Sequence, residues 1–223
     1  MNWAAECVVV IPCLNEEKSI DRVVRAAREF LPRVIVVDDG STDASARFAT
    51  QAGAEFIRHD TPQGKGAALI AGWKRAAELG FAWALTMDGD GQHNAKDIPT
   101  FLAAAKDGEV DLVVGNRFAS DGQMPWLRRK VNHWMSRRLS RAAGIALPDS
   151  QCGFRLMRLD AWKKVDLRTR HFEIESEMLL KFASQGFKIA FVPVQTIYRD
   201  ECSKINPWRD TLRWFSWWRQ RNR

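Results

Sequence analysis

The chain has 223 residues, of which 46% are hydrophobic and 27% charged, a composition that excludes intrinsic disorder, collagen and coiled coils. Its four cysteines form no C-x-x-C pair, which argues against a disulfide scaffold or a zinc ribbon and favours a reducing cytosol. The net charge of +7 is uneven: 12 Lys/Arg against 16 Asp/Glu give −4 in residues 1–110, and 22 against 11 give +11 in residues 111–223. Seven of the ten tryptophans lie in that basic second half, which favours anionic partners.

The first half of the chain alternates predicted strands and helices. We expect strands over residues 7–11, 34–37, 54–57, 83–87 and 112–114, and helices over residues 16–30, 44–51, 66–79 and 97–105. Strands separated by helices predict βαβ crossovers and a mostly parallel sheet, so the expected fold class is α/β. No basic region precedes the first apolar run, so we expect no signal peptide. No segment reaches the ~18–20 apolar residues of a spanning helix.

The second half is more basic and aromatic. Residues 127–143 predict a basic amphipathic helix, residues 172–185 a further helix and residues 188–193 a strand. A tryptophan- and arginine-rich segment closes the chain. Over residues 208–220, helical spacing places Trp208, Leu212, Phe215 and Trp218 on one face, with Trp214 beside them. We expect this face to contact a membrane surface, and the alternative is that both amphipathic helices bury their apolar stripes in the core.

Polar side chains gather where the predicted parallel strands end, which is where such sheets bind ligands. The segments that follow successive strands are Asn15-Glu16-Glu17, Asp38-Asp39, Asp88 to His93, and Asn116-Arg117. Several carboxylates at one edge repel each other unless a cation lies among them, and oxygen ligands beside glycines suit Mg²⁺ or Mn²⁺.

Each signal has a simpler alternative when it stands alone. An isolated Asp-x-Asp is common in turns, and residues 38–43 match a turn followed by a helix N-cap. Residues 63–66 resemble a phosphate loop only weakly, and His93 is equally a bystander or a ligand. In order along one α/β chain, however, these signals indicate a single site.

Together, these motifs resemble those of family 2 glycosyltransferases. The matching segments are residues 11–17 (IPCLNEE), 37–43 (VDDGSTD), 64–66 (GKG) and 87–93 (MDGDGQH). Residues 115–118 (GNRF) and 149–155 (DSQCGFR) extend the resemblance toward dolichyl- or polyprenyl-phosphate sugar synthases. The resemblance covers roughly residues 6–205 and implies a GT-A fold, a nucleotide-sugar donor and a divalent cation, Mg²⁺ or Mn²⁺.

The resemblance also implies roles for single residues. The nucleotide-sugar pocket would be formed by Pro12, Asn15, Glu16, Asp39, Asp88 and Gly89, with Asp39 accepting a hydrogen bond from the base. The cation would be held against the donor phosphates by Asp88, Asp90 and Gln92. The acceptor phosphate would meet Arg117, Arg128, Asn132, Arg199 and Lys204. Asn132 stands where the family has serine, and the loop that carries Arg199 and Lys204 is one residue shorter and lacks the family's glycine. For Arg117 and Arg128 the alternative is ordinary surface solvation.

The acceptor decides whether a general base is needed. A phosphate oxygen is already anionic at neutral pH and attacks once it is positioned in line with the leaving group. A hydroxyl acceptor needs a base, for which Asp149, which matches the family's acidic position, and Glu175 are the candidates. The resemblance suggests a single displacement with inversion.

These inferences predict a catalytic domain over residues 1–206 and a Trp/Arg-rich tail over residues 207–223. Residues 1–118 would bind nucleotide-sugar and metal, and residues 119–206 the acceptor. The expected function is sugar transfer from a GDP- or UDP-sugar to a polyprenyl phosphate by a cytoplasmic, peripheral membrane enzyme, held at the lipid by a separate membrane subunit or by surface binding alone. The alternatives are a soluble or protein-borne hydroxyl acceptor and a basic–aromatic nucleic-acid-binding protein. We expect no nucleic-acid partner, because the chain has no RNP, KH or zinc motif.

Overall fold

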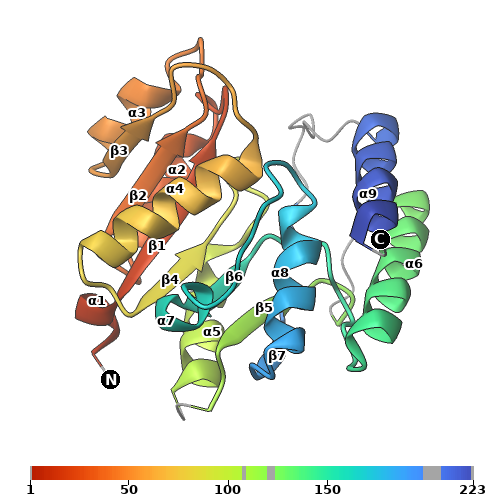
Figure 1. The fold of residues 1–223 in the computed structure, drawn as a ribbon. Helices are drawn as coiled ribbons and strands as arrows, with labels where there is room; N and C mark the ends of the chain where they lie inside the picture. Colours follow the sequence, from red (N-terminus) through yellow and green to blue (C-terminus); the bar gives the residue numbers. More distant parts are fainter. Residues whose placement is uncertain (1, 107–108, 120–123, 198–206, 222–223) are drawn as a thin grey trace.

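The computed structural model describes residues 2–106, 109–119, 124–197 and 207–221. Its strands form one seven-stranded sheet in the order β3-β2-β1-β4-β6-β5-β7 (Figure 1). The strands are β1 Cys7–Cys13, β2 Val34–Asp38, β3 Glu55–Arg58, β4 Trp83–Thr86, β5 Leu112–Asn116, β6 Arg155–Arg158 and β7 Ile189–Pro193. The helices are α1 Trp3–Glu6, α2 Ile20–Arg28, α3 Ser45–Gln51, α4 Lys65–Glu78, the 3₁₀ turn η1 Ala95–Asp97, α5 Ile98–Ala105, α6 Trp126–Ala143, α7 Leu159–Trp162, α8 Ile174–Ser184 and α9 Pro207–Arg221.

The predicted mostly parallel α/β sheet is confirmed. Strands β3, β2, β1 and β4 pair in parallel, as do β5 and β7, whereas β6 runs antiparallel between β4 and β5. Strand β6 is missing from the sequence prediction because its four residues, Arg-Leu-Met-Arg, form no β-branched run. Its first residue, Arg155, is buried, and its guanidinium donates to the backbone carbonyls of residues 150, 152 and 175. Tertiary contacts therefore create this strand.

Helix α2 begins four residues later than its sequence pattern predicts. Asn15 adopts a left-handed backbone conformation with φ of 52°, which an asparagine tolerates better than most residues. The backbone N–H groups of Asn15 and Glu16 donate to the hydroxyls of Ser41 and Ser45. These amides are tied to the neighbouring loop, so the helix starts only at Ile20.

The core lies between the sheet and its helices. Strands β1 and β2 are buried along almost their whole length, and α4 crosses in front of them in Figure 1. The close approach of α4 requires a glycine. A Cβ atom placed on Gly72 would overlap Cγ1 of Val10 and lie 3.1 Å from Cγ2 of Val37. The missing side chain therefore sets the distance between this helix and the sheet.

Helices α6 and α9 lie side by side next to α8 (Figure 1). The Trp134 and Trp214 rings meet edge to face at 5.7 Å between centroids. Trp214 is only 2% exposed, and its indole N–H donates to the Ser176 hydroxyl at 2.9 Å. The core-burial alternative is therefore correct for Trp214, although Leu212 is 68% exposed. Among the described residues, no helix has both the length and the apolar character needed to cross a bilayer.

We predict that Gly72→Ala destabilises the protein, although alanine is the better helix former. The added methyl group overpacks the contact with Val10, an effect that typically costs about 1–3 kcal/mol. Thermal unfolding should show a lower midpoint for Gly72→Ala than for the wild type. Lys74→Ala, an exposed change on the same helix, is the control and should leave the midpoint unchanged. A midpoint raised by Gly72→Ala would contradict the tight contact between α4 and the sheet.

Candidate nucleotide-sugar and cation site

The loops that follow β1, β2 and β4 meet at one edge of the sheet. This convergence follows from the topology, because β1 lies between β2 and β4 and runs parallel to both. The hydroxyl of Ser19 donates to the Gly89 carbonyl at 2.7 Å. A Cβ atom on Gly89 would lie 3.2 Å from the Pro12 carbonyl oxygen. The structure thus brings the predicted residues Pro12, Glu16 and Gly89 together, since that same Cβ would lie 3.4 Å from Cγ of Glu16.

Asn15 fastens this edge to the loop after β2. Its side-chain oxygen accepts a hydrogen bond from the backbone N–H of Thr42 at 2.8 Å, and its own N–H donates to the Ser41 hydroxyl at 2.8 Å. Ser41 also donates to the buried carboxylate of Asp38. Asn15 therefore positions the predicted pocket edge, and direct contact with a nucleotide stays a prediction.

Asp39 is buried and holds the start of α4. Its carboxylate accepts hydrogen bonds from the Gln63 and Gly64 backbone N–H groups at 2.8 and 2.7 Å. The His59 ring nitrogen Nδ1 lies 2.8 Å from the same carboxylate. Each carboxylate oxygen has two lone-pair sites, so a hydrogen bond to a base remains compatible with these contacts and stays a prediction.

Asp88 forms the charged centre of the site. Its Oδ1 lies 2.6 Å from the Lys65 ammonium, an ion-pair contact without the alignment of a hydrogen bond. Burial alone would raise the pKa of Asp88, but the positive charge of Lys65 outweighs it and lowers the pKa to about 2. A Cβ on Gly153 would lie 2.9 Å from Oδ2 of Asp88. The glycine of the GFR segment therefore leaves room for this carboxylate.

The pKa of Asp90 is shifted in the opposite direction from that of Asp88. Burial and the negative charges of Asp88 and Glu16 raise its pKa to about 6, against a lowering by the Gln92 backbone N–H and by Lys65. The Gln92 N–H donates to Asp90 Oδ1 at 3.0 Å. The raised pKa of Asp90 indicates that negative charge is in excess around this carboxylate.

This donor set fits a divalent cation. Asp88 Oδ1 and Asp38 Oδ2 are the two buried side-chain oxygens in the described part of the chain that accept no aligned hydrogen bond. No group of three His, Cys, Asp or Glu residues among the described residues is arranged to hold a metal ion. Asp88 and Asp90 instead suit a cation that takes its other oxygens from phosphates and water, as Mg²⁺ commonly does. The Gln92 amide as a further ligand stays a prediction.

His93 belongs to the supporting structure of the site. Its Nδ1 accepts a hydrogen bond from the Asp88 backbone N–H at 3.1 Å, which leaves the proton on Nε2. The ring stacks on Phe154 with 4.9 Å between centroids, and burial lowers its pKa to about 4. His93 is therefore neutral at physiological pH and orients the Asp88 loop.

Lys65 and Glu175 form a buried pair that the sequence did not predict. The Lys65 ammonium lies 2.7 Å from Glu175 Oε1, in addition to its contact with Asp88. Burial would lower the pKa of Lys65, but the two carboxylates raise it above its ordinary value. The signal for Lys65 that the sequence offered was its place between two glycines at the start of a helix. Its partner Glu175 is distant in sequence, and nothing around it indicated the pairing.

Arg117 and Asp149 form a second buried pair. The guanidinium donates from Nε and Nη2 to the two carboxylate oxygens at 2.8 and 2.9 Å. Burial alone would raise the pKa of Asp149, but Arg117 holds it below its ordinary value. Asp149 is therefore a weak base that orients Arg117, and contact between Arg117 and an acceptor stays a prediction.

Two of the other predicted acceptor residues lie on α6. Arg128 and Asn132 are one turn apart on this helix, where Asn132 is buried and its Nδ2 lies 4.0 Å from the Met124 sulfur. Arg199 and Lys204 lie outside the described residues.

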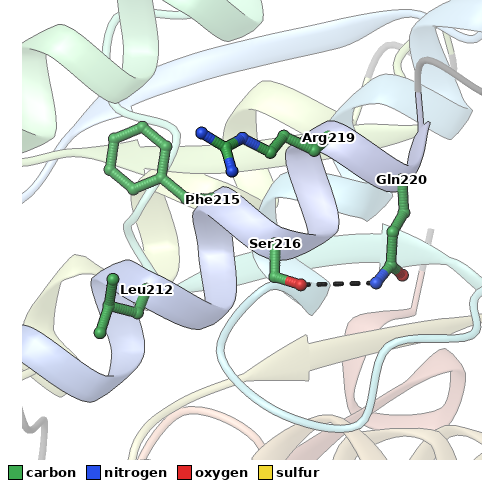
Figure 2. Close-up of a pocket in the computed structure, with 5 residues that line it drawn as sticks. All are labelled: Leu212, Phe215, Ser216, Arg219 and Gln220. Carbon is green, nitrogen blue, oxygen red and sulfur yellow. Dashed lines mark hydrogen bonds between the residues drawn. The ribbon is translucent and has the colours of Figure 1, made fainter.

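A hollow of the described surface lies elsewhere. It measures about 580 Å³, opens along α9 and is lined by Leu212, Phe215, Ser216, Arg219 and Gln220 (Figure 2). Ser216 and Gln220 interact across one helical turn at 3.4 Å, as Figure 2 shows. This hollow shares no residue with the acidic site and is open to solvent. We therefore place the candidate active site at the edge of the sheet that carries Asp88 and Asp90.

Solved structures confirm the GT-A fold. Glucosyl-3-phosphoglycerate synthase from Mycobacterium tuberculosis, in complex with Mn²⁺, UDP and glucosyl-3-phosphoglycerate, superposes with a TM-score of 0.70 at 22% identity, covering 93% of this chain and 75% of that one. The acidic edge therefore lies in a protein with the GT-A fold. The model of glycosyl transferase family 2 matches residues 8–166. The chain belongs to this family and is a glycosyltransferase.

Its sequence relatives include lipid-phosphate enzymes. The chain is 30% identical over 206 residues to an undecaprenyl-phosphate mannosyltransferase of Micrococcus luteus, covering 86% of this chain and 84% of the relative. It is 31% identical over 215 residues to a UDP-N-acetylglucosamine–dolichyl-phosphate N-acetylglucosaminyltransferase of Methanococcus voltae, covering 86% of each. It is 26% identical over 207 residues to a polyprenol monophosphomannose synthase of Mycolicibacterium smegmatis, covering 86% and 78%.

We predict that Asp90→Asn stabilises the protein at neutral pH. The folded-state pKa of about 6 lies above the ordinary value of 3.8, so ionisation of Asp90 destabilises the fold as pH rises from 4 through 6. The penalty is on the order of 2–3 kcal/mol above that window, at about 1.4 kcal/mol per pKa unit. Asp90→Asn should therefore unfold at a higher temperature than the wild type at pH 7.5 and at the same temperature near pH 4.

The control is Asp160→Asn, because Asp160 is exposed and pairs only with the exposed Lys163. It should show no pH-dependent difference from the wild type. Equal midpoints for Asp90→Asn and the wild type at pH 7.5 would contradict the charge crowding inferred at Asp90.

Proposed function

We propose that this glycosyltransferase transfers a sugar from a GDP- or UDP-sugar to a polyprenyl phosphate. The observation that carries the proposal is that both candidate general bases, Asp149 and Glu175, are engaged in buried ion pairs. A hydroxyl acceptor needs such a base to remove its proton. A phosphate acceptor is already anionic and needs only to be positioned. The names of the three relatives support the same choice.

The donor would lie over the edge formed by the loops after β1, β2 and β4. Asp88, Asp90 and Gln92 would hold a divalent cation there, which would supply positive charge against the leaving diphosphate. The solved neighbours that hold Mn²⁺ or Mg²⁺ with UDP support this assignment. Gly89 and Gly153 leave room for close approach, because neither presents a side chain beside the Asp88 loop. Asn15 and Asp39 fix the loops that would surround the nucleotide.

Arg117 would align the acceptor phosphate. Its two-point pairing with Asp149 fixes the plane of the guanidinium before any ligand arrives, and such preorganisation lowers the entropic cost of positioning. Arg128 and Asn132 on α6 would add further donors. The phosphate oxygen would attack the anomeric carbon as the bond to the nucleoside diphosphate breaks, a single displacement with inversion.

Membrane contact would come from α6 and α9. Helix α6 carries six Lys/Arg and no Asp/Glu, and Trp126 and Leu127 are 67% and 60% exposed. Lys130 and Arg138 lie over the Trp126 and Trp134 rings. Basic side chains beside exposed aromatic rings suit the anionic headgroup region of a bilayer. Peripheral binding there would bring the active site to a lipid-borne acceptor.

We assign the reaction to the cytoplasmic face of the membrane. The described cysteines Cys7, Cys13 and Cys152 are free thiols buried in the core, which supports a reducing compartment. A separate membrane subunit would be a second means of holding the enzyme at the lipid.

The decisive experiment incubates the protein with Mn²⁺ or Mg²⁺, radiolabelled GDP- and UDP-sugars and undecaprenyl phosphate in detergent. We expect label from one donor to enter the organic phase as a glycosylated lipid. Asp90→Ala should lower the rate at least ~100-fold, as the loss of a preorganised electrostatic group typically does, whereas Asp160→Ala should not. Label that stays in the aqueous phase as a soluble glycoside would refute the lipid acceptor.

We also predict that Trp126→Glu with Leu212→Glu weakens binding to phosphatidylglycerol liposomes at least tenfold in a flotation assay. The two changes remove exposed apolar area that would be buried in the bilayer, at about 25 cal/mol per Å², and add negative charge. Deleting α9 would be a poorer test, because it would uncover the core around Trp214. Leu79→Glu, a comparable change at the far end of α4, is the control. Liposome binding that is unaffected by the double variant would exclude these helices as the contact.

A further inference from the structure

The loop that carries Asp149 fixes the position of Arg117. This loop, residues 149–152, lies between α6 and β6. Asp149 Oδ2 accepts hydrogen bonds from the Arg117 backbone N–H and from its Nε at 3.1 and 2.8 Å. Oδ1 accepts one from Arg117 Nη2 at 2.9 Å. The place and the plane of the guanidinium therefore depend on where this loop lies.

Gln151 connects the Asp149 carboxylate to helix α8. Its backbone N–H donates to Asp149 Oδ1 at 3.2 Å. Its side-chain Nε2 donates to the hydroxyls of Ser150 and Ser176, both at 3.0 Å. An amide nitrogen of this kind carries two N–H donors, so both are used. Burial would raise the pKa of Asp149, but Arg117, helped by the Gln151 N–H, holds that pKa below its ordinary value.

The two hydroxyls that Gln151 contacts are themselves fixed. Ser176 is completely buried on α8, and its oxygen also accepts the indole N–H of Trp214 on α9 at 2.9 Å. The Ser150 hydroxyl lies 3.0 Å from the hydroxyl of Ser136 on α6, which accepts the Ser150 backbone N–H at 3.0 Å. Three helices that lie next to one another in Figure 1 thus provide the anchor for Gln151.

The carbonyl groups of the same loop are fixed from the sheet. Arg155, the first residue of β6, donates from Nη2 to the Ser150 carbonyl at 3.0 Å and from Nε to the Cys152 carbonyl at 2.8 Å. Buried polar groups that are fully hydrogen-bonded make a local structure rigid. The loop is therefore held on two sides, by the sheet through its carbonyls and by the helices through Gln151 and Ser150.

We propose that Gln151 is a positioning residue for the acceptor phosphate, acting through Asp149 on Arg117. Its side chain ties the loop to α8 and so fixes the carboxylate that orients the guanidinium. Without the amide this tie is lost, and Asp149 and Arg117 gain freedom to shift together as a pair. A displacement of about 1 Å in a positioning group can lower a rate by up to ~10²-fold. The inference rests on the proposed contact between Arg117 and the acceptor phosphate.

The test replaces Gln151 by methionine, which has a similar volume and no amide. In Gln151→Met, kcat/KM for undecaprenyl phosphate in detergent should fall on the order of tenfold. Binding of GDP and UDP, measured by calorimetry, should stay unchanged, because Pro12, Asn15 and Asp39 lie on other loops. Ser176→Ala removes the same hydrogen bond from the other side and should act in the same direction. The loss in the combined variant should be smaller than the product of the two single losses.

A second measurement reports on Arg117 itself and needs no acceptor. The Arg117 Nε–H, which is buried against Asp149, should give a slowly exchanging ¹⁵N–¹H nuclear magnetic resonance signal, assigned by its loss in Arg117→Lys. In Gln151→Met this proton should exchange with solvent faster, because local opening exposes it more often. Gln151→Asn, whose amide is one methylene shorter, replaces Gln151→Met if that variant fails to fold, as judged by circular dichroism, and should show the same changes.

The control for lost stability is Gly72→Ala, which we expect to lower the unfolding midpoint through the contact between α4 and the sheet. It should change neither the acceptor kinetics nor the Arg117 signal. A Gln151 variant that lowers only the midpoint would overturn the proposal, as would equal losses of nucleotide binding and transfer. A wild type that does not glycosylate undecaprenyl phosphate would instead refute the proposed function. In that case, unchanged exchange of the Arg117 Nε–H in Gln151→Met would still overturn the positioning role.

Discussion

Buried negative charge at one edge of the sheet is the constraint on which the rest of this structure depends. Asp38, Asp39 and Asp149 are almost completely buried, and a buried carboxylate is costly unless it is paired or hydrogen-bonded. Each is compensated differently: Asp38 by the Ser41 amide and hydroxyl, Asp39 by backbone amides, and Asp149 by a guanidinium. The loops around the site follow the paths that supply these donors.

The negative charge is less completely compensated at Asp88 and Asp90, where we expect the cation to bind. Asp88 shares a single ammonium with Glu175, and Asp90 retains a raised pKa because Asp88 and Glu16 lie near it. Stability would be served by more positive charge at this place. A site that leaves carboxylates in excess is instead suited to an arriving cation and a ligand that carries oxygens. The excess of carboxylate charge therefore explains both the lower stability of this edge and its proposed function.

The sequence predicted the fold well and the site only in part. Strands such as 7–11 and 34–37 were predictable because parallel strands buried on both faces form continuous apolar runs, and the acidic residues followed from their places at strand ends. Strand β6 was not predictable, because arginines at both of its ends interrupt the apolar run that is typical of a buried strand. The partners of the charged groups also escaped prediction. Nothing near Lys65 in sequence indicates Glu175, and the helical spacing that sets Trp214 beside the predicted membrane-contacting residues does not reveal its contact with Ser176. Pairings between distant segments depend on packing, which local patterns do not encode.

The central claim is that the loops after β1 and β4 hold a cation against a nucleoside diphosphate. The most direct measurement is a crystal structure grown with Mn²⁺ and GDP or UDP, with data collected at the manganese absorption edge. The account predicts one strong anomalous peak within coordination distance of Asp88 and Asp90, bridged to phosphate oxygens. A nucleotide bound elsewhere, or an anomalous peak at carboxylates away from this edge, would contradict it.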